Sequence, residues 1–160
     1  ARAHGCEVTT VQYPALPSGL RGNPEQIEAA VQTALSAVEP QLEAVLRTDY
    51  DRIFSFSKSI GTAIAARYAV LHGLHPGQVY FTPIEAALPD LDPAGIAFHG
   101  TVDPWARTEL ITEGCRRLGV PLHLTENADH SMETGDVLRD ITILHTILEQ
   151  TERWMRQRCI

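Results

Sequence analysis

Short apolar runs alternate along the chain with segments in which apolar residues recur every three or four positions. The short runs are rich in β-branched and aromatic residues and predict strands at residues 7–13, 52–57, 78–82, 95–99 and 121–124. The periodic segments predict helices at residues 24–45, 60–72, 105–118 and 136–157. Strands that alternate with helices at this spacing predict a parallel sheet with helices on both faces.

Two of the predicted helices carry further signals. Asn23 is a good N-cap and Pro24 suits a first helical position, while Pro40 inside the same segment predicts a kink. In the last helix, apolar side chains share one stripe that we expect to face the sheet: Val137, Ile141, Leu144, Leu148 and Trp154.

Length and composition predict a single globular domain over residues 1–160, because 160 residues with 44% hydrophobic side chains suit one core. The net charge of −7 argues against nucleic acid as a partner. No apolar run approaches the roughly 20 residues of a membrane span, and no signal peptide is visible at the N-terminus. We therefore expect a cytoplasmic protein that does not bind membranes.

The cysteines are odd in number and far apart, which favours reduced thiols over disulfides or a zinc site. Cys6 and Cys115 are expected on buried faces, and Cys159 lies near the C-terminus. Metal-ligand spacings such as H-E-x-x-H are missing, so no metal is expected. Gly5 has the character of a helix C-cap, which suggests a helix that begins before Ala1.

Candidate chemistry lies where the predicted strands end, because parallel sheets bind ligands beyond the carboxyl ends of their strands. Ser59 follows one strand in the sequence Ser57-Lys58-Ser59-Ile60-Gly61, whose small residues suit a tight turn that exposes a hydroxyl. A serine needs a base, and the base needs an orienting acid. Two later strand exits offer Asp103 and His130.

The chain resembles the α/β-hydrolase family in three segments: residues 56–62, 99–104 and 127–131. The order Ser, Asp, His is also that of the family. The resemblance is greatest to small, lidless bacterial hydrolases related to dienelactone hydrolases and carboxylesterases. It implies a three-layer α/β/α sandwich without a cap domain, with Ser59 as nucleophile, His130 as general base and acid, and Asp103 orienting the imidazole.

The same resemblance implies that the Ile60 amide is one oxyanion-hole donor and that no cofactor is needed. Two departures stand out. Ser57 replaces the first glycine of the family's turn, and nothing precedes residues 7–13 that matches the family's first central strand and the loop that supplies a second oxyanion donor. The N-terminal strands of the fold are therefore expected to be missing.

For several side chains near the predicted triad, the sequence allows more than one role. Lys58, the only lysine, either contacts an anionic substrate or is solvated, and the loop around it matches neither a phosphate-binding loop nor a β-lactamase motif. Trp105 and Met132 either line the substrate pocket or pack over the triad. Asp129 is an alternative orienting acid, and His99 is more typical of a satisfied core histidine than of a catalytic one.

Three functions remain open on these grounds. The first is a serine hydrolase that cleaves a small carboxylic ester or related acyl substrate. The second is a non-catalytic binding or assembly module on the same fold, and the third is an acyltransferase that uses the same triad. An uncovered sheet edge or the terminal helix would support a homodimer.

Overall fold

The computed structural model describes residues 6–158 and contains a four-stranded, fully parallel sheet. Its strands follow one another in chain order: β1 (Phe54–Lys58), β2 (Gly77–Phe81), β3 (Ile96–Gly100) and β4 (Leu122–Thr125). All four coincide with predicted strands to within two residues at their starts and ends. Because all four strands run parallel, their carboxyl ends meet at one edge of the sheet, where the candidate residues lie.

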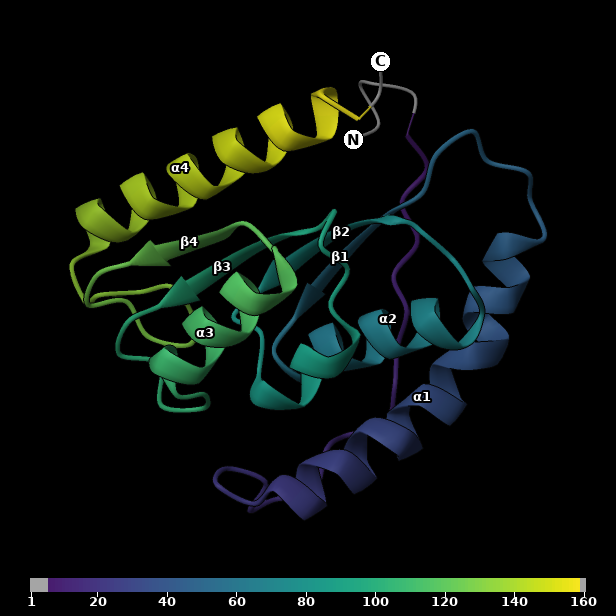
Figure 1. Cartoon of the computed structure of the whole chain (residues 1–160), viewed down its shortest axis with the longest axis horizontal. Helices are drawn as coiled ribbons and strands as arrows, with labels where there is room; N and C mark the ends of the chain where they lie inside the picture. Colours follow the sequence, from purple (N-terminus) through teal and green to yellow (C-terminus); the bar gives the residue numbers. More distant parts are fainter. Residues whose placement is uncertain (1–5, 159–160) are drawn as a thin grey trace.

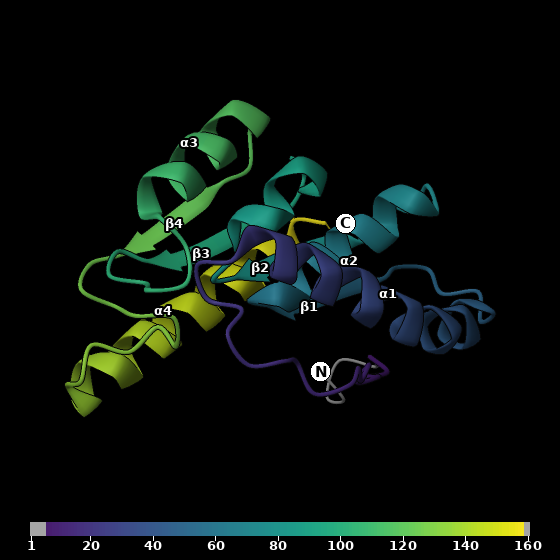
Figure 2. The same cartoon turned by 90° about the horizontal axis from the view of Figure 1, so that it is seen from below.

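Helices cover both faces of this sheet, which confirms the predicted three layers (Figure 1). One layer holds α2 (Ile60–Leu71), the short 3₁₀ helix η2 (Glu85–Asp90) and α3 (Thr108–Leu118). Of the described helices, only α4 (Val137–Arg156) covers the other face. The long helix α1 (Pro24–Leu46) runs beside α2 (Figure 2).

Helix α1 begins as its sequence predicts. The Asn23 side chain accepts a hydrogen bond from the Gln26 amide, and Pro24 occupies the first turn, where an N–H would lack a helical partner. The helix continues through Pro40 and changes direction in its second half (Figure 1). A proline inside a helix removes one backbone hydrogen bond and bends the axis, which agrees with the predicted kink.

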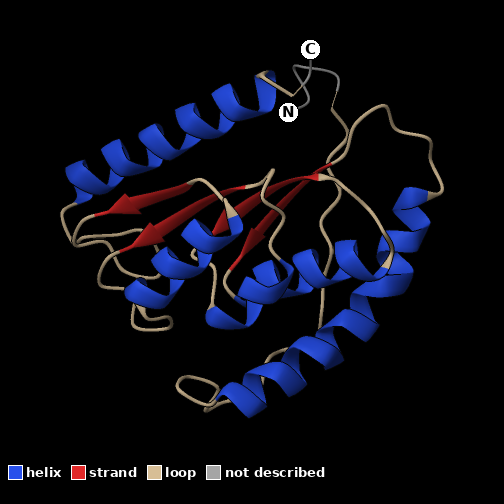
Figure 3. Ribbon diagram, in the orientation of Figure 1, coloured by secondary structure: helices blue, strands red, loops and turns tan. Residues whose placement is uncertain are grey.

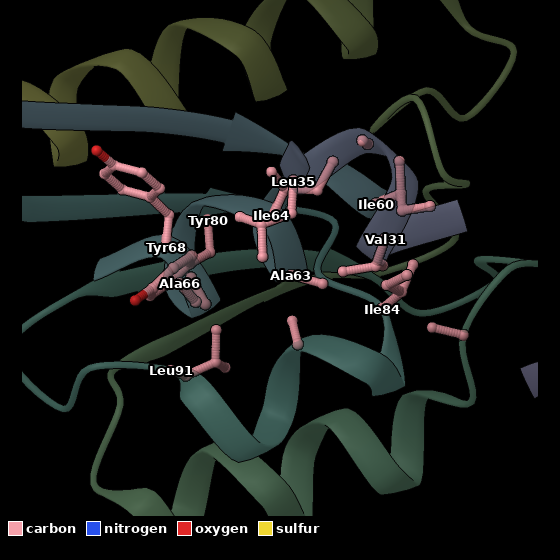
Figure 4. Close-up of a cluster of buried hydrophobic side chains, with 14 of the residues drawn as sticks. Val31, Leu35, Ile60, Ala63, Ile64, Ala66, Tyr68, Tyr80, Ile84 and Leu91 are labelled. Atoms are coloured by element: carbon pink, nitrogen blue, oxygen red, sulfur yellow. The ribbon is translucent and has the colours of Figure 1, made fainter. Parts of the chain in front are cut away.

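Two apolar cores form because successive strand residues point to opposite faces of the sheet. Tyr80 joins the larger core with α1, α2, η2 and α3, where Val31 and Ile64 also pack (Figure 4). Its neighbour Val79 joins the smaller core beneath α4, together with Phe98. Both faces of the central strands are therefore buried, as the near-continuous apolar runs predict.

The strand predicted at residues 7–13 is wrong. This segment is extended but pairs with no strand among the described residues (Figure 3), and Val8 is 65% exposed. The backbone of Gln12 instead exchanges hydrogen bonds with the Gln41 side chain of α1, at 3.1 and 2.6 Å. Cys6, expected on a buried face, is exposed. β-branched residues favour a strand only where another strand offers its edge.

The apolar stripe predicted on the last helix also faces the wrong way. Val137, Ile141, Leu144 and Leu148 of α4 are 56–71% exposed, whereas Trp154 is buried as expected. The residues that pack on the sheet with Trp154 are instead Ile147 and Thr151. The helix is apolar on two adjacent faces, and the sheet covers only one of them.

The predicted homodimer stays a prediction, and its two candidate surfaces are now defined by this exposed stripe of α4 and by the outer edge of β1. We expect light scattering of the purified chain to give twice the 17.6 kDa chain mass. A monomeric mass that persists at high protein concentration would contradict this prediction.

Within residues 6–158, no helix has the length and apolar character needed to cross a membrane. The same part of the chain contains no group of three or more histidine, cysteine or acidic side chains placed to hold a metal ion. Cys115 is buried, and burial raises the pKa of its thiol to about 11. Gly5, the predicted helix cap, and Cys159 lie outside the described residues.

Candidate active site

Ser59 lies on a sharp turn between β1 and α2. Its backbone has φ 55° and ψ −129°, a conformation that non-glycine residues rarely adopt. The Ser59 amide donates to the Phe81 carbonyl at 3.0 Å, which continues the pairing of β1 with β2, and α2 begins at the next residue. The strand, turn and helix together place the Ser59 side chain beyond the carboxyl end of the sheet.

Ser57 fits this turn although it replaces an expected glycine. Its side chain is buried against β2, and its hydroxyl donates to the Val79 carbonyl at 3.3 Å. The turn has space on the other side of Ser59 as well, because an added Cβ at Gly61 would lie 3.9 Å from the Tyr13 hydroxyl, an ordinary van der Waals distance. A serine at 57 therefore leaves the turn intact.

His130 connects Ser59 to Asp103. Its Nε2 lies 2.7 Å from the Ser59 hydroxyl oxygen, and its Nδ1 lies 2.7 Å from Oδ2 of Asp103. In the tautomer whose Nδ1–H donates to Asp103, Nε2 accepts the Ser59 hydroxyl proton. The three side chains, which come from three strand exits, thus form one hydrogen-bonded chain.

The Asp103 carboxylate is buried and fully engaged. Oδ2 accepts from His130, and Oδ1 accepts from the Trp105 amide at 2.8 Å. Burial by itself would raise the pKa of this carboxyl, but the hydrogen bonds from His130 and Trp105 outweigh burial and lower the pKa. Asp103 is therefore negatively charged at neutral pH, and its charged carboxylate lies against the imidazole of His130.

The loop that carries His130 packs directly on the end of β3. An added Cβ at Gly100 would lie 2.2 Å from the Ala128 carbonyl oxygen, so only glycine permits this approach. The Val102 amide donates to the same carbonyl at 3.1 Å, and the Asn127 amide donates to the Thr101 hydroxyl at 2.9 Å. These contacts fix the His130 loop relative to Asp103.

Asp129 has a different role from the orienting acid considered for it. Its Oδ1 accepts from the amides of Ser131 and Glu133, at 2.7 and 3.2 Å, and so shapes the loop from within. Asp103, not Asp129, faces the imidazole of His130.

His99 is a member of this cluster for which the sequence favoured a core role over a catalytic one. It is fully buried, its Nε2 lies 3.2 Å from the Thr108 hydroxyl, and its Nδ1 lies 3.6 Å from Oδ2 of Asp103. Burial lowers the pKa of His99, and the charge of Asp103 opposes that effect only in part. The four-residue spacing to Asp103 at a strand exit was the one signal in the sequence that pointed to this contact.

Several solved structures share this arrangement of strands and helices. XC6422 from Xanthomonas campestris, an α/β serine hydrolase without a lid, aligns with a TM-score of 0.56 and 17% identity over 77% of this chain and 56% of its own. SOBER1 from Arabidopsis thaliana aligns with a TM-score of 0.56 and 16% identity over 83% of this chain and 66% of its own.

The esterase PE8 aligns with a TM-score of 0.53 and 17% identity, over 84% of this chain and 69% of its own. The fold of the chain is that of the α/β-hydrolases. This chain spans about 56 to 69% of the length of the three aligned proteins. No protein-family model and no curated protein sequence matches the chain.

Two further predicted site residues, Ile60 and Trp105, lie beside Ser59 and His130. Ile60 is the first residue of α2, where backbone amides lack an acceptor within the helix. The Trp105 ring lies 5.8 Å from the His130 ring and is 40% exposed, so it forms part of the open surface beside the imidazole.

Met132, which was expected beside the substrate pocket or over the triad, lies in the core beneath α4. Its side chain is buried in the core beneath α4, with Val79, Phe98, Ile147 and Trp154. The backbone at Met132 has φ 64°, so the loop turns there and directs the side chain into this core. The structure thus gives Met132 a packing role, one of the two that the sequence left open, and a contact with substrate stays a prediction.

The buried His99 predicts a pH dependence of stability. Its pKa is lower in the folded chain than in the unfolded one, so the unfolded state binds the proton more readily. Above the unfolded pKa of about 6.5, His99 is neutral in both states and its titration does not change the free energy of unfolding. As the pH falls below that value, the unfolded state takes up the proton first, and the free energy of unfolding decreases. Burial lowers the pKa of His123 as well, so this histidine adds to the same trend.

We expect His99→Gln to reduce the loss of unfolding free energy between about pH 7.5 and 5.5, because glutamine has no group that takes up a proton in this range. Denaturant unfolding at the two pH values measures this difference, with His145→Gln as a control because His145 is exposed on α4. An unchanged pH slope in His99→Gln would contradict the assignment.

Proposed function

We propose that this site is the active site of a serine hydrolase that cleaves small carboxylic esters or related acyl substrates. The observation that carries the proposal is the chain of two 2.7 Å contacts from Ser59 through His130 to Asp103. A serine hydroxyl is a weak nucleophile by itself, and a histidine held in this position can take its proton as attack begins.

The first half of the proposed reaction acylates Ser59. His130 Nε2 accepts the Ser59 hydroxyl proton while the oxygen bonds to the ester carbonyl carbon, and the carbonyl oxygen becomes an oxyanion. The Ile60 amide is the donor that we assign to this oxyanion. His130 then gives the proton to the departing alkoxide, which leaves as an alcohol, and the acyl group stays on Ser59.

Deacylation repeats these steps with water. His130 Nε2 takes a proton from water as the water oxygen attacks the acyl carbon, and it returns a proton to the Ser59 oxygen when the ester bond breaks. The products are the free acid and the original serine. Asp103 keeps the Nδ1–H tautomer in place and stabilises the imidazolium that forms in both halves.

Two further observations support an acyl substrate. Trp105 stands beside the imidazole with two fifths of its surface exposed, so an apolar wall borders the site on an open side. The fold neighbours include an esterase and a serine hydrolase described as having no lid.

Hydrolysis of p-nitrophenyl acetate, butyrate and octanoate by the purified chain tests the proposal. We expect saturable turnover that is fastest with the short esters and that His130→Ala removes. A folded chain that hydrolyses none of them would favour the binding-module alternative. Turnover that appears only with an added alcohol or amine acceptor would favour the acyltransferase.

A further inference from the structure

Lys58 makes a contact that neither sequence-based assignment anticipated. It is the last residue of β1 and directly precedes Ser59. Its side chain is exposed, and its Nζ donates to the backbone carbonyl of His130 at 2.9 Å. The ammonium group therefore links the strand that carries the nucleophile to the loop that carries the base.

The His130 loop is attached unequally on its two sides. Toward β3 it has backbone contacts through Ala128 and Asn127, together with the close approach at Gly100. Toward the Ser59 turn, two hydrogen bonds join the described residues: Ser59 Oγ with the imidazole, and Lys58 Nζ with the His130 carbonyl. Asp103 holds the imidazole from the β3 side, and these two hydrogen bonds hold it on the side of Ser59.

One of the two hydrogen bonds cannot last through the reaction. Once Ser59 is acylated, its oxygen is part of an ester and has no proton to donate to Nε2. The Lys58 contact is made to a backbone carbonyl and does not change when Ser59 is acylated. In the acyl-enzyme it is thus the remaining hydrogen bond, among those of the described residues, between the turn and the His130 loop.

We propose that Lys58 is a positioning residue that holds His130 over the acylated Ser59, so that the imidazole can activate water for deacylation. This inference rests on the serine-hydrolase function proposed above. Acylation starts with the Ser59–His130 hydrogen bond in place and needs Lys58 less. Deacylation starts without it, and even a small displacement of a catalytic group slows a step markedly.

The lysine side chain suits this role. Its charged donor forms a stronger hydrogen bond to a carbonyl than a neutral donor does, and its long stem reaches the neighbouring loop from an exposed position. Methionine has similar length and no donor, whereas arginine keeps charged donors. Because the side chain is exposed, neither replacement is expected to disturb the fold.

The test compares wild type, Lys58→Met and Lys58→Arg with p-nitrophenyl acetate in stopped flow and by intact mass after acid quench. In Lys58→Met we expect deacylation to slow by about tenfold. Acylation should change by less than about twofold, so that a burst of p-nitrophenol appears and a chain one acetyl group heavier accumulates. Lys58→Arg should restore most of the deacylation rate. Circular dichroism and thermal unfolding verify that each variant is folded.

The outcomes separate the inference from the function on which it rests. Equal slowing of both steps, or no slowing of deacylation, in a folded Lys58→Met overturns the positioning role while wild type still turns over. A folded wild-type chain that is never acylated overturns the proposed function and the positioning role together. Failure of Lys58→Arg to recover deacylation also argues against a hydrogen bond as the cause.

Discussion

Replacing Ser59 by alanine is expected to lower kcat for short esters by about 10⁶-fold, which leaves no measurable turnover above the background reaction. The side chain supplies the attacking oxygen, and the Ser59 hydroxyl is the group that contacts Nε2 of His130. Alanine keeps a Cβ at the φ of 55°, so the backbone of the turn has the same conformational cost. Circular dichroism and thermal unfolding should therefore match the wild type.

Ser131→Ala is the control for the first prediction. This serine lies beside His130 in the same loop and is exposed, and its amide is held by Asp129, which the substitution leaves intact. Activity close to wild type is expected. Substantial esterase activity in Ser59→Ala would mean that another group, or a contaminant, performs the reaction.

Replacing Asp103 by asparagine is expected to lower kcat by about 10⁴-fold with little change in KM. The asparagine oxygen can still accept from the Trp105 amide, so its NH₂ group would face His130. An NH₂ donor favours the tautomer in which Nδ1 accepts and Nε2 carries the proton. Nε2 then cannot take the proton of Ser59. Steady-state kinetics with p-nitrophenyl acetate measures the loss.

Asp129→Asn is the matched control for Asp103→Asn. Both substitutions remove one carboxylate close to His130, but at position 129 the side-chain oxygen of the introduced asparagine can still accept from the amides of Ser131 and Glu133. We expect a kcat within about threefold of wild type, because these loop contacts remain. Equal losses in the two variants would show that negative charge near the site matters, and not the contact between Asp103 and the imidazole.

Most of the sheet and the three strand exits could be predicted because their signals are local. Apolar runs of about five residues, each followed by a periodic segment, predict buried parallel strands regardless of what they pack against. The Ser59 turn is also local, since small neighbours allow its positive φ. Once the strands are parallel, the chain order alone places Ser59, Asp103 and His130 at one edge of the sheet.

The errors arise where structure depends on a distant partner. Residues 7–13 have strand-forming side chains, but a strand needs another strand's edge, and Gln12 pairs instead with a side chain of α1. The periodicity of α4 identifies an apolar stripe without saying which of two adjacent faces the sheet covers. The contact of Lys58 likewise depends on a distant residue, His130.

Intact-mass labelling with a fluorophosphonate tests most directly whether Ser59 is an activated nucleophile. Such probes bond covalently to a serine whose proton is removed by a positioned base. We predict one adduct on the folded wild-type chain, located at Ser59 by peptide mapping and lost in both Ser59→Ala and His130→Ala. No adduct on the folded chain, or an adduct that persists in His130→Ala, would contradict the proposed serine-hydrolase mechanism.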